Sequence, residues 1–225
     1  MTPANLKKFR WAVWLGLLGC ILMGGSDWLM IYGDTSYTGA LAWLTAGAAA
    51  IHPQRNALAM LLAFPAVILY AAALFGMALL VRQPRHKTVY QALTALGQTP
   101  WLCLHLFYIM ILFTFGWLST HGQAALAAPV GEAMFHQFWW LVLAGEALIL
   151  LPFLYWLWLV ATGHTLLPRW MAVNSPLTWY VVGKLATAVM PDAPFRLAFT
   201  NGLMSEAMVV FLLVQLWAAH RYAAR

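Results

Sequence analysis

Apolar runs of about 20 residues recur along the whole length of the chain. An α-helix of that length crosses about 30 Å, the thickness of the hydrocarbon core of a bilayer. A transmembrane β-barrel would instead show alternating segments of about 10 residues, which the sequence lacks. Composition agrees, because 64% of the residues are hydrophobic and 8% are charged, whereas about 25% are charged in typical soluble domains. The sequence therefore predicts an all-α, polytopic transmembrane helical bundle that forms a single integral membrane domain.

Hydropathy and prolines place five spans directly and a sixth by its position. The third span is expected to begin at Pro100, because Thr99 can cap a helix and proline is favoured at the first helical position. The segment 177–190 is short, reaching roughly 21 Å. The segment 39–51 is too short to cross and is predicted to be interfacial or re-entrant, and 88–97 is predicted to be a short amphipathic surface helix. The predicted spans are 11–31, 56–81, 100–119, 134–160, 177–190 and 195–219.

The distribution of basic residues orients these spans. With six spans and a cytoplasmic N-terminus, nine Lys and Arg residues fall inside and two, Arg55 and Arg196, fall outside. Such an excess on the cytoplasmic side is typical of inner-membrane proteins. We therefore predict a multi-pass protein of the cell inner membrane with both termini in the cytoplasm. Membrane lipids are its expected partners, and nucleic-acid binding is not expected because no soluble basic domain is present.

Glu146 lies near the middle of the fourth predicted span. A charge at that depth costs roughly 2.5–3.5 kcal/mol even on mild insertion scales. The helical rise places Glu206 at the same level, Lys184 halfway along the short fifth span near Asn201, and His105 slightly toward the cytoplasm. Such residues either hold helices together, with Lys184 paired to one glutamate, or line a hydrated cavity. We take these five residues as candidates for binding a substrate or an ion.

Asp27 belongs to a second polar group toward the outer side of the first span. The helical rise places it about 8–15 Å from the Glu146 and His105 level, measured along the membrane normal. A metal site formed by these three residues is therefore not expected, and no cofactor motif occurs in the sequence. The candidates for a general base or an acid–base partner are Glu146, His105 and Asp27.

The loop after the fourth span carries a third group of candidates, His164, Arg169 and Trp170. Arginine can bind a lipid phosphate while tryptophan lies in the headgroup layer. The same residues can also act as simple interfacial anchors.

Several short motifs resemble an uncharacterised bacterial family of multi-pass inner-membrane proteins, grouped under a domain of unknown function. The resemblance implies the same fold and location, and it carries no activity. The motifs are the acidic element Gly25-Ser26-Asp27 with Trp28 to Gly33, His105, the loop Gly163-His164-Thr165 through Pro168-Arg169-Trp170 to Asn174-Ser175-Pro176, and the stretch from Pro191 to Asn201.

Three functions from different classes fit the sequence. The first is a small carrier or binder whose midplane cavity handles protons, a cation or a small amphipathic solute, with Glu146 and Glu206 as sites and Lys184 as counter-charge. The second is an intramembrane enzyme acting on a lipid-like substrate. The third is a structural or assembly subunit without chemistry of its own. A carboxylate and an imidazole within about 3 Å in a cavity open sideways to lipid would favour the second function. A dry polar layer with Lys184 paired to a glutamate, and a large flat apolar outer face, would favour the third.

Overall fold

The computed structural model describes residues 1–33, 41, 42 and 51–223, and the described chain is helical. The predicted segment 39–51 lies almost entirely outside the described residues. Short helical turns follow α3, precede α6 and follow α7. The main helices are α1 (Pro3–Ile31), α3 (Pro53–Met77), α4 (Pro84–Thr120), α5 (Ala124–Ala161), α6 (Pro176–Val189) and α7 (Pro194–Ala218), and the turns are Ala78–Leu80, Arg169–Val173 and Ala219–Ala223.

Proline at the first turn and a side-chain cap define where several helices begin. Thr2 accepts a hydrogen bond from the N–H of Asn5 at 3.3 Å, and Ser175 accepts one from the N–H of Thr178 at 3.1 Å. Each bond satisfies one of the first amide groups of its helix, which have no partner within the helix. The helices that start with proline are those at Pro3, Pro53, Pro84, Pro176 and Pro194.

The α4 and α5 helices are longer than the sequence predicted. Residues 88–97 do not form a separate surface helix, because α4 runs without a break from Pro84 through Pro100. A proline inside a membrane helix is tolerated where neighbouring helices support the freed backbone. Here α5 packs tightly on both sides of it: a Cβ on Gly97 would lie 2.8 Å from the Leu148 carbonyl oxygen, and one on Gly145 would lie 3.2 Å from that of Pro100. The α5 helix begins at Ala124 and contains a kink at Phe138 (φ −117°, ψ 16°).

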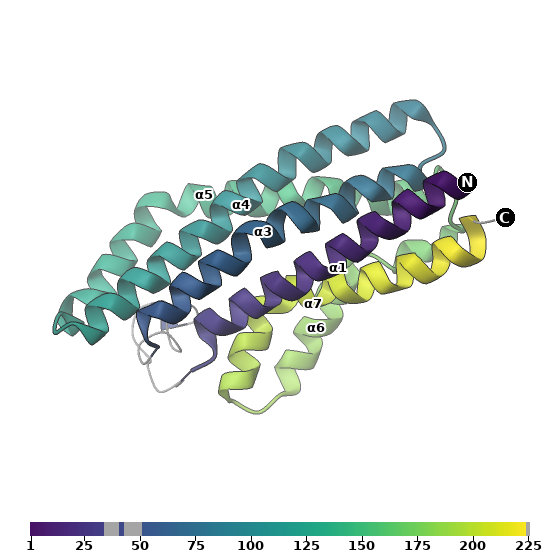
Figure 1. The fold of residues 1–225 in the computed structure, drawn as a ribbon. Helices are drawn as coiled ribbons and strands as arrows, with labels where there is room; N and C mark the ends of the chain where they lie inside the picture. The colour runs from purple at the N-terminus through teal and green to yellow at the C-terminus, as the bar shows by residue number, and fades with distance from the viewer. Residues whose placement is uncertain (34–40, 43–50, 224–225) are drawn as a thin grey trace.

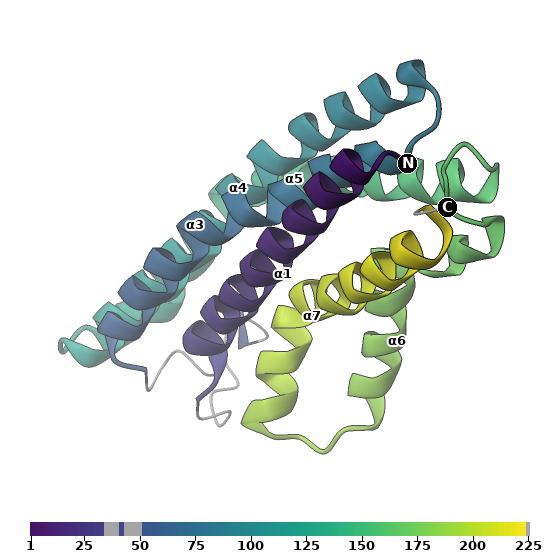
Figure 2. The same ribbon diagram turned by 45° about the vertical axis from the view of Figure 1, so that its right-hand side comes forward.

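Pairwise packing of antiparallel helices builds the bundle (Figure 1). The α1 helix packs on α3 and on α7, α4 packs on α5, and α6 packs on α7. Figure 2 shows the hairpin of α6 and α7 as a separate arm beside the α3–α4–α5 group. By length and composition α1, α3, α4, α5 and α7 can each cross a membrane, which makes the chain an integral membrane protein. The α6 helix has 14 residues and reaches about 21 Å.

Both termini lie at one end of the bundle, which we call the terminal end (Figure 1). The N-terminal ammonium of Met1 donates a hydrogen bond to the carbonyl of Ala223 at 3.0 Å. Arg10 and His220 also meet there, with 2.7 Å between Nη2 and Nδ1. The contacts place the start of α1 beside the end of α7.

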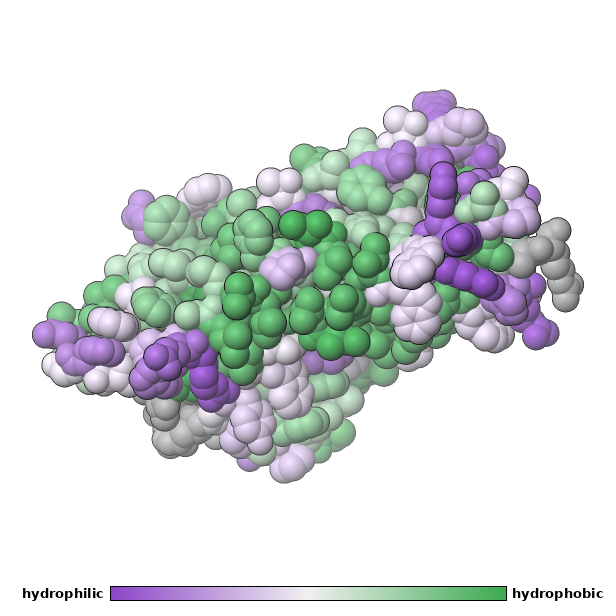
Figure 3. Space-filling model, viewed as in Figure 1, coloured by the Kyte–Doolittle hydropathy of each residue, from purple (hydrophilic) through white to green (hydrophobic). Residues whose placement is uncertain are grey.

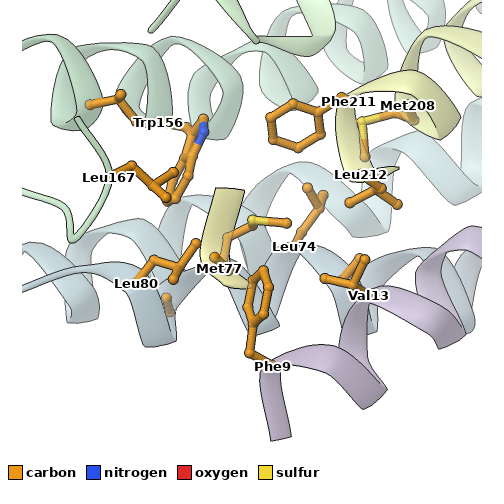
Figure 4. Close-up of a cluster of buried hydrophobic side chains, with 14 of the residues drawn as sticks. Phe9, Val13, Leu74, Met77, Leu80, Trp156, Leu167, Met208, Phe211 and Leu212 are labelled. Carbon is orange, nitrogen blue, oxygen red and sulfur yellow. The ribbon is translucent and has the colours of Figure 1, made fainter. Parts of the chain in front are cut away.

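The surface and the core have the distribution expected in a bilayer. Hydrophobic residues cover the middle of the face seen in Figure 3, and hydrophilic residues gather toward its two ends. Near the terminal end, buried side chains fill the interior, among them Phe9 of α1, Leu74 of α3, Trp156 of α5 and Phe211 of α7, with Leu167 of the loop (Figure 4).

Candidate functional site

A cavity of about 810 Å³ lies among α1, α4, α5, α6 and α7. Methionine, leucine and isoleucine side chains line much of it, and polar side chains from different helices point into it. Of the predicted site residues, the cavity brings together Asp27, His105, Glu146, Lys184 and Asn201. Small-molecule sites in proteins have volumes of about 300–1,000 Å³ and a mixed lining of this kind.

Asp27 and His105 form the buried part of the cavity wall. Asp27 Oδ1 lies 3.7 Å from His105 Nε2, and the two residues are 9% and 8% exposed. This separation allows an ion pair when the imidazole is protonated and is too long for a direct hydrogen bond. The hydroxyl of Ser205 on α7 donates to Asp27 Oδ2 at 3.4 Å. One carboxylate thus has an imidazole on one side and a hydroxyl on the other.

The expected separation of Asp27 from the His105 level was wrong. That estimate measured depth from predicted span limits, whereas α1 and α4 both begin well before those limits, at Pro3 and Pro84. Counted from these starts at 1.5 Å per residue, Asp27 lies about 36 Å and His105 about 32 Å along its helix. Both helices start at the terminal end, so the two side chains reach the same level.

Glu146 on α5 and Lys184 on α6 lie on the exposed part of the cavity wall. The Lys184 ammonium lies 5.3 Å from the centre of the Tyr180 ring. Within the described part of the chain, Lys184 forms no ion pair with either glutamate. The predicted Lys184–glutamate pair is therefore not observed, and opposite charges stand on two different helices at the cavity.

Glu206 does not join the cavity, in contrast to the predicted single layer of polar residues. It lines a separate pocket of about 320 Å³ between α1 and α7, beside Gly24 and Gly25. Trp28 donates a hydrogen bond from Nε1 to Glu206 Oε1 at 3.0 Å. Consecutive residues of each helix thus bond in opposite directions across the α1–α7 contact: Ser205 to Asp27 on the cavity side, and Trp28 to Glu206 on the other. Depth along the membrane gives no information about the face of a helix, which is why the sequence placed both glutamates together.

Further polar residues of the cavity wall were missed from the sequence, namely Tyr108, Tyr180, Asp192, Arg196, Thr200 and Ser205. Residues three or four apart on a helix share a face. Tyr108 follows His105 by three positions and Tyr180 precedes Lys184 by four, so helical spacing from the candidates already chosen would have found both. Ser205 follows the candidate Asn201 by four positions, so the same spacing would have found it, but its partner Asp27 comes from another helix and could not be found in this way.

The Asp27–His105 arrangement is chemically suited to proton transfer. Across the described residues, no group of three or more His, Cys, Asp and Glu side chains is placed to hold a metal ion. A carboxylate beside an imidazole can take up a proton, release it, or orient the imidazole as a general base.

The three loop candidates lie at the terminal end, away from the cavity. Trp170 contacts Tyr222, with ring centroids 6.3 Å apart. His164 packs against His86, with ring centroids 4.5 Å apart. Arg169 lies over Gly163, where a Cβ would be 3.0 Å from the Arg169 Nε. His164 and Arg169 thus lie in one loop, and Trp170 points to the C-terminal turn.

Comparison with known proteins identifies a family. A family of unknown function, DUF6796, matches residues 4–222. The chain belongs to this family. The match to DUF6796 covers nearly the whole chain and confirms the resemblance to an uncharacterised family. No curated protein and no solved structure matches. Because the description of DUF6796 carries no activity, the function of this member is argued from its cavity.

Proposed function

We propose that this protein is a membrane carrier or binder that holds a small amphipathic molecule in the cavity and takes up a proton at Asp27 and His105. The observation that carries the proposal is the Asp27–His105 pair, 3.7 Å apart, in the wall of a cavity of about 810 Å³. Intramembrane ionisable residues that face a cavity typically mark ion or substrate pathways.

The cavity is lined by both apolar and charged side chains, which suit the two ends of an amphipathic molecule. Apolar side chains such as Leu150, Leu177 and Met204 suit a hydrocarbon body, and Glu146 and Lys184 offer a negative and a positive charge to a polar head. Glu146 and Lys184 are exposed, so they mark the side on which the cavity opens, between α5 and α6. The sequence suggested Glu146 and Glu206 as the proton or cation sites of a carrier. Because Glu206 lies outside the cavity, we assign its role to Asp27.

Photo-crosslinking tests the binding step. The probes are a long-chain carboxylic acid and a long-chain amine, each bearing a diazirine in its chain, with the full-length protein in lipid vesicles. We expect crosslinks at Leu150, Leu177 or Met204 with at least one probe, weakened by Lys184→Gln for the acid or by Glu146→Gln for the amine. Crosslinks confined to the outer, lipid-facing surface would contradict the proposal.

Proteoliposomes with an internal pH dye test the proton step. We expect Asp27→Asn to change the proton movement that accompanies uptake of the crosslinked amphiphile, with the protein still folded. Glu132→Gln is the matched control, because it removes a carboxylate that does not line the cavity. Equal proton movement in the Asp27→Asn variant and in the unmodified protein would argue against the carrier.

The second candidate is an intramembrane enzyme with a lipid-like substrate. It is favoured by the same pair, since a carboxylate beside an imidazole is the arrangement that orients a histidine as a general base. Incubation with a total lipid extract, followed by mass spectrometry, should show a product that is absent with His105→Gln. An unchanged lipid profile with the unmodified protein would remove this candidate.

The location in the cell follows from charge. Lysine and arginine gather in segments at the terminal end, and we assign that end to the cytoplasmic side of a bacterial inner membrane. The third function, an assembly subunit, would be favoured by an ion pair between Lys184 and a glutamate, and among the described residues Lys184 has no such pair.

A further inference from the structure

Two loops at the terminal end are joined by backbone contacts. One leads from α3 into α4, and the other follows α5. Val81 and Thr165 form an antiparallel bridge between them, and the N–H of Arg82 donates to the carbonyl of His164 at 2.9 Å. The start of α4 is thereby held beside the loop that contains His164 and Arg169.

Two histidines meet where these loops join. The rings of His86 and His164 have centroids 4.5 Å apart. His86 Nδ1 lies 2.8 Å from the hydroxyl of Tyr155, and the Trp158 ring lies 5.3 Å from His86 and 5.2 Å from His164. The two imidazoles therefore pack against the aromatic side chains of Tyr155 and Trp158 at the end of α5.

Three arginines surround the histidine pair. Arg82 donates from Nε to the Thr165 carbonyl at 2.7 Å, which fixes its guanidinium against the loop. Arg169 is exposed and its side chain passes beside Gly163, which has a φ of +79° and on which a Cβ would lie 3.0 Å from the Arg169 Nε. Arg85 is exposed in the first turn of α4, one position before His86. Of the three guanidiniums, that of Arg82 is thus fixed by a hydrogen bond to the loop.

Among the described residues, no Asp or Glu side chain forms an ion pair with these arginines. The segments 1–10, 82–87, 161–175 and 219–223, which come together at the terminal end, contain no Asp or Glu. Among the described residues, the ion pairs are His105–Asp27 and Arg196–Asp192, both elsewhere. An anion is therefore the missing partner of the arginines.

We propose that Arg82, Arg85, His86, His164 and Arg169, which we call the basic surface, bind a phosphate group. Guanidinium groups bind phosphate oxygens in pairs, and imidazole adds a further donor. The phosphate can belong to a lipid headgroup or to a soluble molecule. This site lies outside the cavity and does not depend on the function proposed there.

Native mass spectrometry of the full-length protein, released from detergent micelles, tests the proposal with phosphatidylglycerol and inorganic phosphate as separate probes. The double variant Arg85→Gln, Arg169→Gln should lose about tenfold or more in affinity for the bound probe, since a hydrogen bond to a charged group contributes about 1.5–3 kcal/mol. Lys7→Gln with Lys8→Gln is the matched control, because it removes the same charge from exposed residues at the same end. The control should stay within about twofold of the unmodified protein, since no specific contact is lost.

The outcomes distinguish a specific phosphate-binding site from general electrostatic attraction to the basic end of the protein. Equal loss in both double variants, or no binding of either probe to the unmodified protein, would overturn the proposal. Inorganic phosphate that displaces phosphatidylglycerol identifies the phosphate group itself as the ligand, and lipid binding without displacement identifies the headgroup as its source. If the double variant melts at a lower temperature, Arg85→Gln alone serves, because that exposed side chain holds no part of the fold.

Discussion

At Gly19 the backbones of α1 and α3 approach as closely as two helices can. A Cβ on this residue would lie 2.5 Å from the amide nitrogen of Tyr70 and 2.8 Å from the carbonyl oxygen of Ala66. Small residues at such contacts let membrane helices pack backbone to backbone, where van der Waals attraction replaces the hydrophobic effect. The packing of α1 on α3 therefore requires glycine at position 19, because a larger side chain would clash with the backbone of α3.

Gly19→Ala should lower the free energy of unfolding by about 1–3 kcal/mol, the usual cost of overpacking a close contact. Gly25→Ala on the same helix is the control, because a Cβ there would meet no atom within 4 Å. Thermal unfolding of both variants in one detergent measures the difference. Equal melting temperatures for the two variants would show that α1 and α3 do not approach this closely.

At the scale of elements, the short α6 helix depends on the loop before it. Asn174, 4% exposed, accepts a hydrogen bond from Trp179 Nε1 at 2.7 Å and donates one to the Phe211 carbonyl at 3.3 Å. It thus ties the loop to the first turns of α6 and to α7. Because Tyr180 and Lys184 of α6 line the cavity, Asn174 also sets the position of that wall.

Asn174→Ala should destabilise the fold by about 1–3 kcal/mol, because the Trp179 indole N–H loses its partner. Val173→Ala next to it is the control, since Val173 is 67% exposed and such substitutions change stability by about 0.5 kcal/mol or less. Thermal unfolding again provides the measurement. A loss no larger than that of the control would mean that the side chain does not anchor α6.

At the scale of the whole molecule, the meeting of the two termini determines the topology. Met1 and Ala223 are joined by a hydrogen bond, so the chain must end on the side where it began. With five long helices, this condition is met only if the α6 segment returns the chain to the opposite side before α7. We therefore predict that the short helix is the sixth crossing, although its length does not reach across a full hydrocarbon core.

Single cysteines test this topology. After replacement of Cys20 and Cys103 by alanine, cysteines at Lys8, Gln123 and Arg221 would be labelled with an impermeant maleimide in intact cells stripped of their outer membrane. We expect Gln123→Cys to react at once, and the other two to react only after permeabilisation. Labelling of Lys8→Cys and Arg221→Cys from opposite sides would show that α6 does not cross.

The sequence by itself determined the class of the protein and most of its helices. Long apolar runs form α-helices in a bilayer, because every backbone polar group must then be paired inside its own segment. Proline as a marker of a helix start failed at Pro100, where packing against α5 supports a proline inside α4. Whether a proline starts a helix or lies within one depends on the neighbouring helix. A hydropathy profile carries no information about which helices are neighbours.

The tertiary structure decided which polar residues meet. Helical rise gives the depth of a side chain, so Glu146, Lys184, His105 and Asn201 could be selected from the sequence, and the cavity holds all four. Depth says nothing of the direction in which a side chain points or of which helices are neighbours. The packing of α7 on α1 turns Asp27 toward His105 and Ser205, and turns Glu206 away to Trp28. These contacts join residues 78 to 178 positions apart, and no local pattern in the sequence encodes them.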